Sequence, residues 1–473
     1  MNRVVGLAAL AALVALVGCT AEDTTSPVVN IVFPADGASL GAGAITIKVL
    51  ATDNEAVAKV EFFDGTTKIG EDGTGTADTF DVSWTATAGA HTLRALASDD
   101  AGNDAEDEID VTVGGGGGPT VHDKDITGGD SIWYPAGNPH IVTRTTHIRE
   151  DGKLTIMPGC LVKFDAGASF IVGSGGTAGE LQAVGKADSL ITFTSNASTP
   201  GAGDWEGFDF YDGTRTQSQL SYCVVDYGGF DAYGAINFDF NGSVGLDHCT
   251  IRNAPKYGIW TTGLGGYPRD FTGDTITACG DYPLYLHPGD LGELGAGNVL
   301  TGNTRDGILV QAGSVEETGT WPNQGVPYVL EGNLTIGSAS GAYLTIADGS
   351  VVKLGPEKSI TVGNTVSGGL KADSVTFTSA ASSPQRGDWY GIWFYEDCND
   401  AECALTGCRI EYGGGDDYGN IWIEDALPSI SGCYIGHSAG WGIYLTGGEY
   451  PTPAALLAFN TFEDNALGDV YEP

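Results

Sequence analysis

The sequence has few basic residues and only one long apolar segment, at its N-terminus. Of the 473 residues, 21 are Lys or Arg and 61 are Asp or Glu, which gives a formal net charge of −40. Nucleic-acid binding needs a basic footprint, so this composition argues against a nucleic-acid partner and against direct binding to anionic lipid headgroups. Beyond the N-terminus, no run approaches the ~20 apolar residues of a membrane-spanning helix. The C-terminal three quarters also lack any long stretch with the apolar period of an amphipathic helix, which argues against a helical fold.

The N-terminus predicts export. Arg3 precedes an almost wholly apolar segment, residues 4–17, which is too short to span a bilayer and is typical of a signal peptide. The sequence Leu16-Val17-Gly18-Cys19 closes this segment and resembles the lipobox of bacterial lipoproteins. The resemblance implies lipidation of Cys19, a tether at residues 20–26, and membrane attachment through the lipid anchor only. The expected location is the outer membrane or cell surface of a bacterium. The alternative is an ordinary secretory signal that happens to contain a cysteine.

Residues 27–113 predict a β-sandwich of about seven strands, because short alternating runs are separated by Asp-Gly turns. The segments Phe33-Pro34-Ala35-Asp36-Gly37-Ala38, 53–65 and 91–103 resemble bacterial Ig-like domains. The resemblance implies a spacer or stalk. Residues 114–120 are rich in glycine and predict a flexible linker.

The remaining chain contains an internal duplication, with one copy at residues 121–311 and the other at residues 312–473. The sequence Gly203-Asp204-Trp205-Glu206-Gly207 returns as Gly387-Asp388-Trp389-Tyr390-Gly391. Short β-runs alternate with turns rich in Gly, Asn and Asp. Equivalent cysteines lie 249 − 223 = 26 and 433 − 408 = 25 residues apart, which predicts the coils of a solenoid.

Cys249-Thr250-Ile251-Arg252-Asn253 and Tyr257-Gly258-Ile259-Trp260 resemble parallel β-helix repeats of the pectate-lyase-like superfold. The resemblance implies a right-handed parallel β-helix, so the expected fold class is all-β: an Ig-like sandwich followed by a duplicated solenoid. The sequence leaves open whether the two copies form one continuous solenoid or two.

Cys398 and Cys403 flank a four-residue loop in the second copy, and an exported protein favours a disulfide between them over a metal site. The paired cysteines of neighbouring coils are expected to form a buried thiol ladder. Disulfides between neighbouring coils are the alternative, because adjacent strands lie within bonding reach.

Aromatic residues recur beside carboxylates in both copies, which suits the binding of sugar rings. The spacing is the same in each, 233 − 227 = 6 and 418 − 412 = 6, and we expect two equivalent patches on one lateral face. The candidate binding residues are Asp226, Tyr227, Asp231 and Tyr233 in the first copy and Glu411, Tyr412, Asp416 and Tyr418 in the second. For Trp205 and Trp389, packing within the solenoid is the favoured interpretation.

The function that these patterns favour is adhesion or binding of an extracellular polysaccharide or surface polymer. Many parallel β-helix proteins are polysaccharide lyases or hydrolases. However, the ordered polygalacturonase series Asn-Thr-Asp, Asp-Asp, Gly-His-Gly and Arg-Ile-Lys is absent, so no catalytic residue is assigned. A carbohydrate-active enzyme of another family and a structural envelope protein stay open as alternatives. No cofactor is required. Ca²⁺ is possible at Asp53, Asp99 and Asp100, where capping of turns is the favoured alternative.

The first prediction is that the mature chain begins with a lipidated Cys19, because a small residue and an apolar run precede it as they do at lipoprotein cleavage sites. Mass spectrometry of the mature N-terminus should show the acyl mass on this cysteine, and Cys19→Ser should release the protein from the membrane fraction. A free α-amine on another residue, without an acyl mass, would contradict the prediction.

Overall fold

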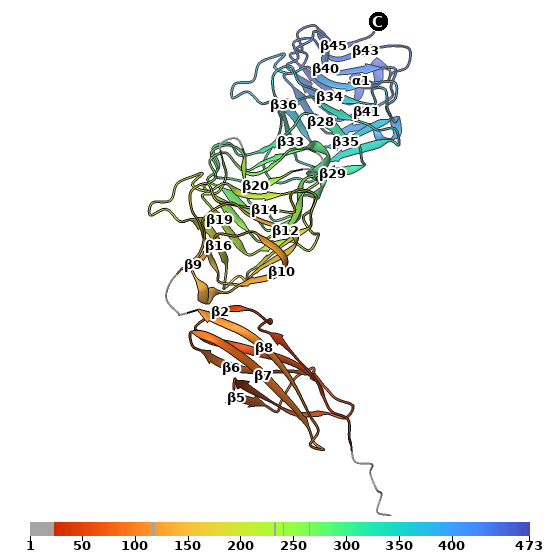
Figure 1. Ribbon diagram of the computed structural model, residues 1–473. Helices are drawn as coiled ribbons and strands as arrows, with labels where there is room; N and C mark the ends of the chain where they lie inside the picture. Colours follow the sequence, from red (N-terminus) through yellow and green to blue (C-terminus); the bar gives the residue numbers. More distant parts are fainter. Residues whose placement is uncertain (1–22, 115–118, 231–232, 240, 264) are drawn as a thin grey trace, which may run out of the picture. The chain divides into compact units, whose positions relative to one another are not determined.

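The computed structural model describes residues 23–114, 119–230, 233–239, 241–263 and 265–473. The chain divides into two compact units, one on each side of the glycine run, and both are built almost wholly from strands (Figure 1). Within the described ranges, no helix is both long enough and apolar enough to cross a membrane. The predicted lipidation site, Cys19, lies outside these ranges.

The N-terminal unit is a β-sandwich, as the sequence predicts. One sheet has the order β1-β3-β6 and the other β2-β8-β7-β4-β5. The pairs are antiparallel except for β2 with β8. Val49, Val60 and Ala95 are fully buried between the sheets. The strands are β1 (Val28–Phe33), β2 (Ser39–Gly41), β3 (Gly43–Thr52), β4 (Val57–Asp64), β5 (Thr67–Asp72), β6 (Thr79–Ala86), β7 (Gly89–Asp99) and β8 (Asp104–Gly114).

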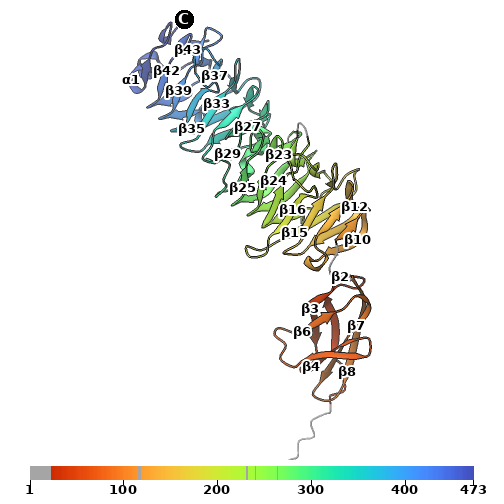
Figure 2. The ribbon, with the colours of Figure 1, turned by 90° about the vertical axis from the view of Figure 1, so that its left-hand side faces the viewer.

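The C-terminal unit is a parallel β-helix, whose coils are stacked one on another in Figure 2. Its described strands pair in parallel, each with its counterpart one coil further on. Along the first copy, one side carries β14 (Ser169–Val172), β17 (Gly207–Phe210), β20 (Gly234–Phe238), β23 (Tyr257–Thr261) and β26 (Leu284–Leu286). A second side carries β15 (Gly179–Val184), β18 (Gln219–Ser221), β21 (Ser243–Asp247) and β24 (Tyr267–Thr272). The third carries β9 (Thr120–His122), β11 (His140–Val142), β13 (Leu161–Phe164), β16 (Ile191–Ser195), β19 (Cys223–Asp226), β22 (Thr250–Arg252) and β25 (Thr275–Thr277).

The first side continues directly into the second copy, and two further sheets complete the coils there. The continuation is β27 (Ile308–Val310), β30 (Tyr328–Leu330), β33 (Val351–Leu354), β36 (Thr376–Ser379), β39 (Arg409–Glu411), β42 (Tyr434–Gly436) and β44 (Thr461–Glu463). A seven-stranded sheet contains β28 (Gly313–Val315), β31 (Leu334–Ile336), β34 (Ser359–Val362), β37 (Gly391–Phe394), β40 (Gly419–Glu424), β43 (Trp441–Thr446) and β45 (Gly468–Tyr471). A five-stranded sheet contains β29 (Gly319–Trp321), β32 (Ala342–Ile346), β35 (Gly368–Asp373), β38 (Ala404–Thr406) and β41 (Ser429–Ser431). The remaining elements are β10 (Ile126–Trp133) and β12 (Thr146–Ile156) at the start, three short 3-10 helices (Pro135–Gly137, Pro288–Glu293 and Asp400–Glu402) and α1 (Pro453–Phe459).

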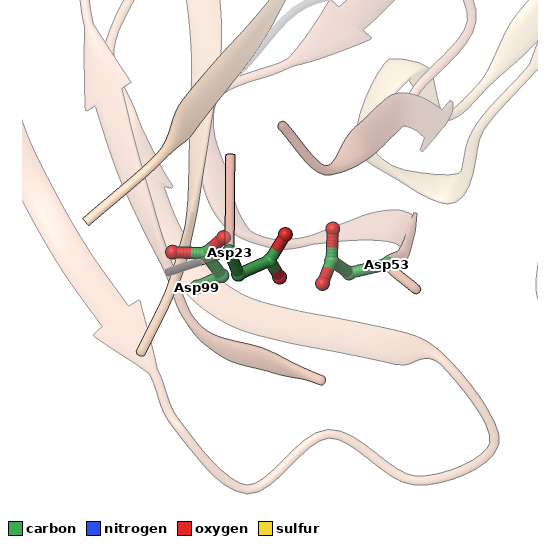
Figure 3. Close-up of side chains that lie close together, drawn as sticks. All are labelled: Asp23, Asp53 and Asp99. Atoms are coloured by element: carbon green, nitrogen blue, oxygen red, sulfur yellow. The ribbon is translucent and has the colours of Figure 1, made fainter. Parts of the chain in front are cut away.

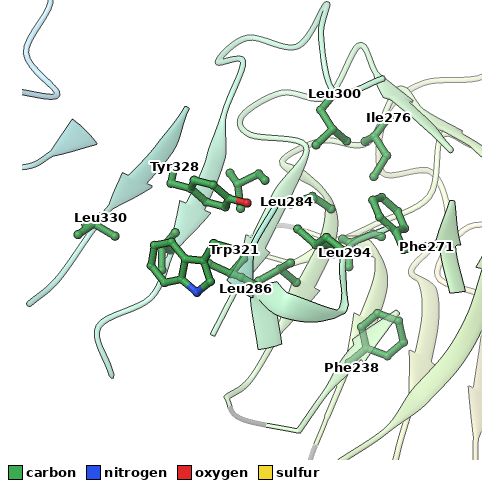
Figure 4. Close-up of a cluster of buried hydrophobic side chains, with 14 of the residues drawn as sticks. Phe238, Phe271, Ile276, Leu284, Leu286, Leu294, Leu300, Trp321, Tyr328 and Leu330 are labelled. Carbon is green, nitrogen blue, oxygen red and sulfur yellow. The ribbon is translucent and has the colours of Figure 1, made fainter. Parts of the chain in front are cut away.

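The two copies form one continuous solenoid, which answers the question that the sequence leaves open. A single apolar core runs from Trp133 to Leu456. Figure 4 shows its side chains from Phe238 to Leu330, on both sides of the junction between the copies. The Nε1–H of Trp321, in the second copy, donates to the carbonyl of Pro288 in the first at 3.0 Å. The core therefore passes through the junction without a break.

The second copy enters the stack shifted by one side of the coil. Val162-Lys163-Phe164 in β13 corresponds in sequence to Val352-Lys353-Leu354 in β33. However, β33 pairs with β30 and continues the sheet of β17 and β20, whereas β13 belongs to a different sheet. Strands that correspond in sequence therefore lie on different sides of the solenoid.

The repeated Gly-Asp-Trp sequence has a structural role in both copies. The Trp205 ring stacks on Phe164 with centroids 4.0 Å apart, and its Nε1–H donates to the carbonyl of Asp226 at 2.9 Å. Trp389 is equally buried and donates to the carbonyl of Glu411 at the same distance. The Asp204 carboxylate accepts the Ser195 hydroxyl at 2.6 Å, which holds the turn before the tryptophan. The packing role favoured for Trp205 and Trp389 is what the structure shows.

We predict that Trp389→Ala lowers the free energy of unfolding by about 3–5 kcal/mol, because it removes a fully buried ring and leaves the Glu411 carbonyl without its donor. Urea denaturation followed by circular dichroism measures the loss. Tyr418→Ala is the control, since its ring is 37% exposed and should cost less than about 1 kcal/mol. Equal losses for the two variants would contradict the prediction.

Candidate functional site

Outward side chains of consecutive coils stand in register on β17, β20 and β23. Phe208 and Phe210 of β17 are fully buried, so strand alternation turns Asp209 outward. The parallel register places Asp209 beside Asn237, and Asn237 beside Trp260. The alternation within each strand and the register between strands thus bring Asp209, Asn237 and Trp260 side by side on three consecutive coils.

These positions border a cavity of about 320 Å³ that we call the acidic pocket. Its three carboxylates belong to Glu206, Asp209 and Asp239. Its aromatic walls are Tyr211, Phe230, Tyr233 and Trp260, and Asn237 and Thr262 complete the lining. No lysine, arginine or histidine is found among the described residues around it.

Hydrogen bonds and burial set the charge of the acidic pocket. The Asn237 amide donates to Asp209 Oδ1 at 3.0 Å, and the hydroxyls of Tyr211 and Thr262 donate to Asp239. Burial raises the pKa of Asp209 from 3.8 to about 7; the Asn237 hydrogen bond opposes this shift, while the charges of Asp239 and Glu206 add to it. Burial also raises the pKa of Asp239. Asp209 therefore titrates close to neutral pH.

The corresponding strands of the second copy carry aromatic side chains instead. Register aligns Trp393 of β37 with Trp422 of β40, Trp422 with Tyr444 of β43, and Tyr444 with Tyr471 of β45. The centroids of Trp393 and Trp422 lie 5.6 Å apart edge to face, and the Tyr444 and Tyr471 rings stack at 4.5 Å. Tyr418 stacks on Trp422 at 4.4 Å and contacts Tyr444 at 5.1 Å. We call these five partly exposed residues the aromatic ladder.

The acidic pocket and the aromatic ladder are two versions of the same duplicated surface. Asp209 corresponds to Trp393 (393 − 209 = 184), and Trp260 corresponds to Tyr444 (444 − 260 = 184). Acidic or amide groups in the first copy are thus replaced by rings in the second, while the acid at Asp239 is kept as Glu424.

The two surfaces do not share a lateral face, which corrects our expectation for the two patches. Strands β17, β20 and β23 lie in the 18-stranded sheet, whereas β37, β40 and β43 lie in the separate seven-stranded sheet. The reason is the shift of the second copy by one side of the coil. Equal spacing in the sequence preserves the position within a coil, but it does not fix which side of the solenoid that position occupies.

Two of the predicted carboxylates are used inside the scaffold. Asp226 is 6% exposed; its Oδ2 lies 2.8 Å from Nη2 of Arg252, and its Oδ1 accepts the Asn253 amide at 2.7 Å. Glu411 is similarly buried and lies 2.5 Å from Nη2 of Arg409. Asp226 therefore joins neighbouring coils, while Glu411 pairs within its own strand and accepts the Thr378 hydroxyl of the neighbouring coil at 3.3 Å, which leaves little of either carboxylate for a ligand.

The predicted tyrosines divide into two groups. Tyr227 and Tyr412 sit at corners with positive φ angles of 63° and 68°, and the Tyr412 ring stacks on His437 at 5.0 Å. In contrast, Tyr233 is 45% exposed and lines the acidic pocket, and Tyr418 covers the aromatic ladder.

The two remaining predicted acids have different outcomes. Asp416 is partly buried, which raises its pKa, and its Oδ1 accepts the backbone N–H of Tyr418 at 3.2 Å. Asp231 lies outside the described residues. Of the predicted residues, Tyr233 therefore belongs to the acidic pocket and Tyr418 to the aromatic ladder, while the other members of both surfaces were not predicted.

Sequence reasoning missed Asp209, Asp239, Trp393 and Trp422 because it searched for residues shared by both copies. These positions are the ones at which the copies differ. A usable signal was present: in Gly207-Phe208-Asp209-Phe210, the two phenylalanines mark the inward positions and leave Asp209 outward.

The cysteines lie away from both surfaces. Cys398 and Cys403 form a disulfide with an S–S distance of 2.08 Å. Six other cysteines in the described ranges are buried free thiols: Cys160, Cys223, Cys249, Cys279, Cys408 and Cys433. Among them, Cys223 and Cys249 occupy neighbouring coils, as do Cys408 and Cys433, so the structure shows thiols in place of disulfides between coils.

A separate acidic cluster lies in the N-terminal unit. Within the part of the chain that the structure describes, only Asp23, Asp53 and Asp99 bring three potential metal ligands within 4.8 Å of one another (Figure 3). Carboxylate oxygens are ligands that Ca²⁺ prefers. Asp99, however, already accepts both the backbone and the side-chain N–H groups of Asn103, and Asp100 is not part of the group. The three carboxylates have the oxygen ligands that a Ca²⁺ site requires, but both oxygens of Asp99 already accept hydrogen bonds within a turn.

Comparison with known proteins gives a family match within the N-terminal unit. Residues 27–95 match the family described as bacterial Ig domain. Among solved structures, the chain is similar to fibronectin(III)-like modules of Clostridium thermocellum CbhA, with 32% identity over 18% of this chain and 96% of that chain and a TM-score of 0.17. It is also similar to a family 28 exopolygalacturonase of Yersinia enterocolitica, with 9% identity over 94% of this chain and 99% of that chain and a TM-score of 0.18. No curated protein matches the sequence. At these TM-scores, neither structural similarity bears on what the chain binds.

We predict that Asp226→Ala lowers the free energy of unfolding by about 1–3 kcal/mol, because Arg252 and Asn253 lose their partner at a buried position. Urea denaturation measures the change. The neighbouring variant Tyr233→Ala, at a position 45% exposed, should cost less than about 1 kcal/mol. An Asp226→Ala protein with unchanged stability but lost ligand binding would show that this carboxylate is a binding residue after all.

Proposed function

We propose that the protein binds an extended, uncharged polysaccharide outside the cell through the aromatic ladder. The observation that carries the proposal is the register of Trp393, Trp422, Tyr444 and Tyr471 on consecutive strands. Flat aromatic faces pack on the C–H faces of sugar rings. Neighbouring strands lie ~4.8 Å apart, so the ladder offers a linear row of partly exposed rings along the solenoid axis, which suits a repeating linear polymer better than a single small molecule.

The charge of the chain supports an uncharged ligand. With a net charge of −40, the protein repels polyanions over distances of about a Debye length. Acidic polysaccharides and nucleic acids are therefore disfavoured, whereas a neutral glycan gains from ring stacking without a Coulomb penalty. Tyr418 contacts Trp422 and Tyr444 contacts Tyr471 before any ligand binds. Because these rings are already held in place, binding a polysaccharide costs less side-chain entropy.

The predicted export signal gives this binding an adhesion-type role. A lipid anchor at Cys19 would hold the chain at the cell envelope, and the bacterial Ig domain would act as a spacer between the anchor and the solenoid. The catalytic and purely structural alternatives differ from this proposal in their outcomes: an enzyme releases product, and a structural protein binds no glycan.

The test is a binding isotherm on a panel of neutral polysaccharides, such as β-glucans, mannans and xylans, measured by affinity electrophoresis and calorimetry. Trp422→Ala should weaken binding ~10-fold or more, because central aromatic anchors carry much of the affinity of an interface. Tyr444→Ala should act in the same direction. The matched control is Trp260→Ala, which changes the residue equivalent to Tyr444 in the first copy and leaves the ladder intact.

Three results would overturn the proposal: no binding to any neutral polysaccharide, equal weakening by Trp260→Ala and Trp422→Ala, or loss of the melting transition in Trp422→Ala. The last outcome would mean that the ring serves packing. Product release from a bound polysaccharide would favour the enzyme alternative.

A further inference from the structure

The acidic pocket has features that the aromatic ladder does not explain. It lies on another sheet, and its three carboxylates face aromatic walls with no basic side chain among the described lining residues. Burying carboxylates together is unfavourable unless a partner offsets the cost. The amide and hydroxyl donors of the pocket satisfy hydrogen bonds of Asp209 and Asp239 but supply no positive charge, so the cavity is suited to a positively charged ligand.

The second copy shows that the scaffold does not need two of these acids, Glu206 and Asp209. The same solenoid position carries Tyr390 in place of Glu206 and Trp393 in place of Asp209, and the coils still stack in register. The carboxylates of Glu206 and Asp209 are therefore additions to the fold, comparable with the ladder rings of the second copy, whereas the acid at Asp239 is kept as Glu424.

The spread of the carboxylates distinguishes an organic cation from a metal ion. A Ca²⁺ ion needs several oxygens around one point, at ~2.3–2.6 Å from the ion. Glu206, Asp209 and Asp239 do not form a group of ligand atoms within 4.8 Å of one another, whereas Asp23, Asp53 and Asp99 do. The volume of about 320 Å³ is that of a site for a small organic molecule.

We propose that the acidic pocket binds the protonated primary amine of an amino sugar. Aromatic faces attract organic cations, and Tyr233 and Trp260 both line the pocket, with their rings edge to face and their centroids 4.8 Å apart. A primary ammonium group has three donors for the separated carboxylates, which a quaternary ammonium group lacks. The sugar hydroxyls find further acceptors in the same carboxylates, and the ring packs on the tryptophan face. This site goes beyond the proposed binding of neutral polymers, and its test is independent of the ladder.

The pH dependence follows from the groups that face Asp209: Glu206 before β17, Asn237 on β20, and Asp239 and Tyr211 beyond the strand ends. An amino-sugar amine has electron-withdrawing neighbours, so its pKa lies nearer to that of an α-amino group (~8) than to that of lysine, and its protonated fraction grows as the pH falls. Asp209, in contrast, becomes neutral below about pH 7. We therefore expect affinity to be highest near neutral pH and to fall by pH ~5.5, since the ligand must there displace a proton from Asp209. Asp209→Asn should weaken binding near neutral pH and remove the fall on the acid side.

The experiment is calorimetry of the full chain with short glucosamine oligomers and with the same oligomers N-acetylated, at ~0.15 M salt to screen long-range attraction. Wild-type protein should bind the amine form at least ~10-fold more tightly than the acetylated form. Asp239→Asn should lose this preference, while Glu424→Gln, the same loss of charge at the equivalent second-copy position, should keep it. Trp422→Ala should keep the preference for the amine form, so a failed ladder and a failed pocket give different results.

A folding control separates binding from stability. Because the pKa of Asp209 is raised in the folded state, its stabilising contribution is present below pH ~4 and is lost as the pH rises towards 7. Asp209→Asn should therefore melt no lower than wild type at pH ~7.5. Equal affinity for both oligomers, equal effects of Asp239→Asn and Glu424→Gln, Ca²⁺ binding that Asp209→Asn abolishes, or cleavage of the oligomer would each overturn the amine proposal.

Discussion

The C-terminal unit depends on the packing of inward side chains at equivalent positions of successive coils. Val162, Phe193, Val225, Ile251 and Ile276 follow one another in register on five strands, and all are fully buried. Because the core is close-packed, a change in side-chain volume at any of these positions disturbs the packing of the neighbouring coils. Outward positions carry no such constraint, since each meets solvent on one side. The replacement of acids by rings that distinguishes the two candidate surfaces is consequently found on the outside.

Divergence after duplication follows this division closely. The inward pair Phe208 and Phe210 remains apolar in the second copy as Ile392 and Phe394, while the outward residue between them changes from Asp209 to Trp393. The shared Gly-Asp-Trp motif is likewise a packing motif. Identity between the copies therefore indicates what folds the coil, and difference between them indicates what the surface has acquired.

The difference between inward and outward positions also explains which features could be predicted from the sequence. The sandwich and the parallel solenoid follow from strand alternation, turn residues and the spacing of Cys223 and Cys249, which are local or repeat with each coil. The side of the solenoid occupied by the second copy depends on the path of the chain through the junction near Pro288 and Trp321, and no periodic signal encodes it. The candidate site was found only at its edges, at Tyr233 and Tyr418, because a carboxylate such as Asp226 looks the same in sequence whether it faces a ligand or an arginine of the neighbouring coil.

The shift of one side also decides how the two surfaces can act together. A linear polymer that runs along the ladder sheet follows one side of the solenoid and cannot at the same time run along the sheet of the acidic pocket, because these are different sheets. Duplication in this chain therefore gives no simple gain in avidity from two aligned patches, which requires simultaneous engagement of both by one ligand. What it gives instead is a rigid body with two independent surfaces, one built from rings and one from buried acids. Since a single core runs through both copies, each surface can change without loss of the other.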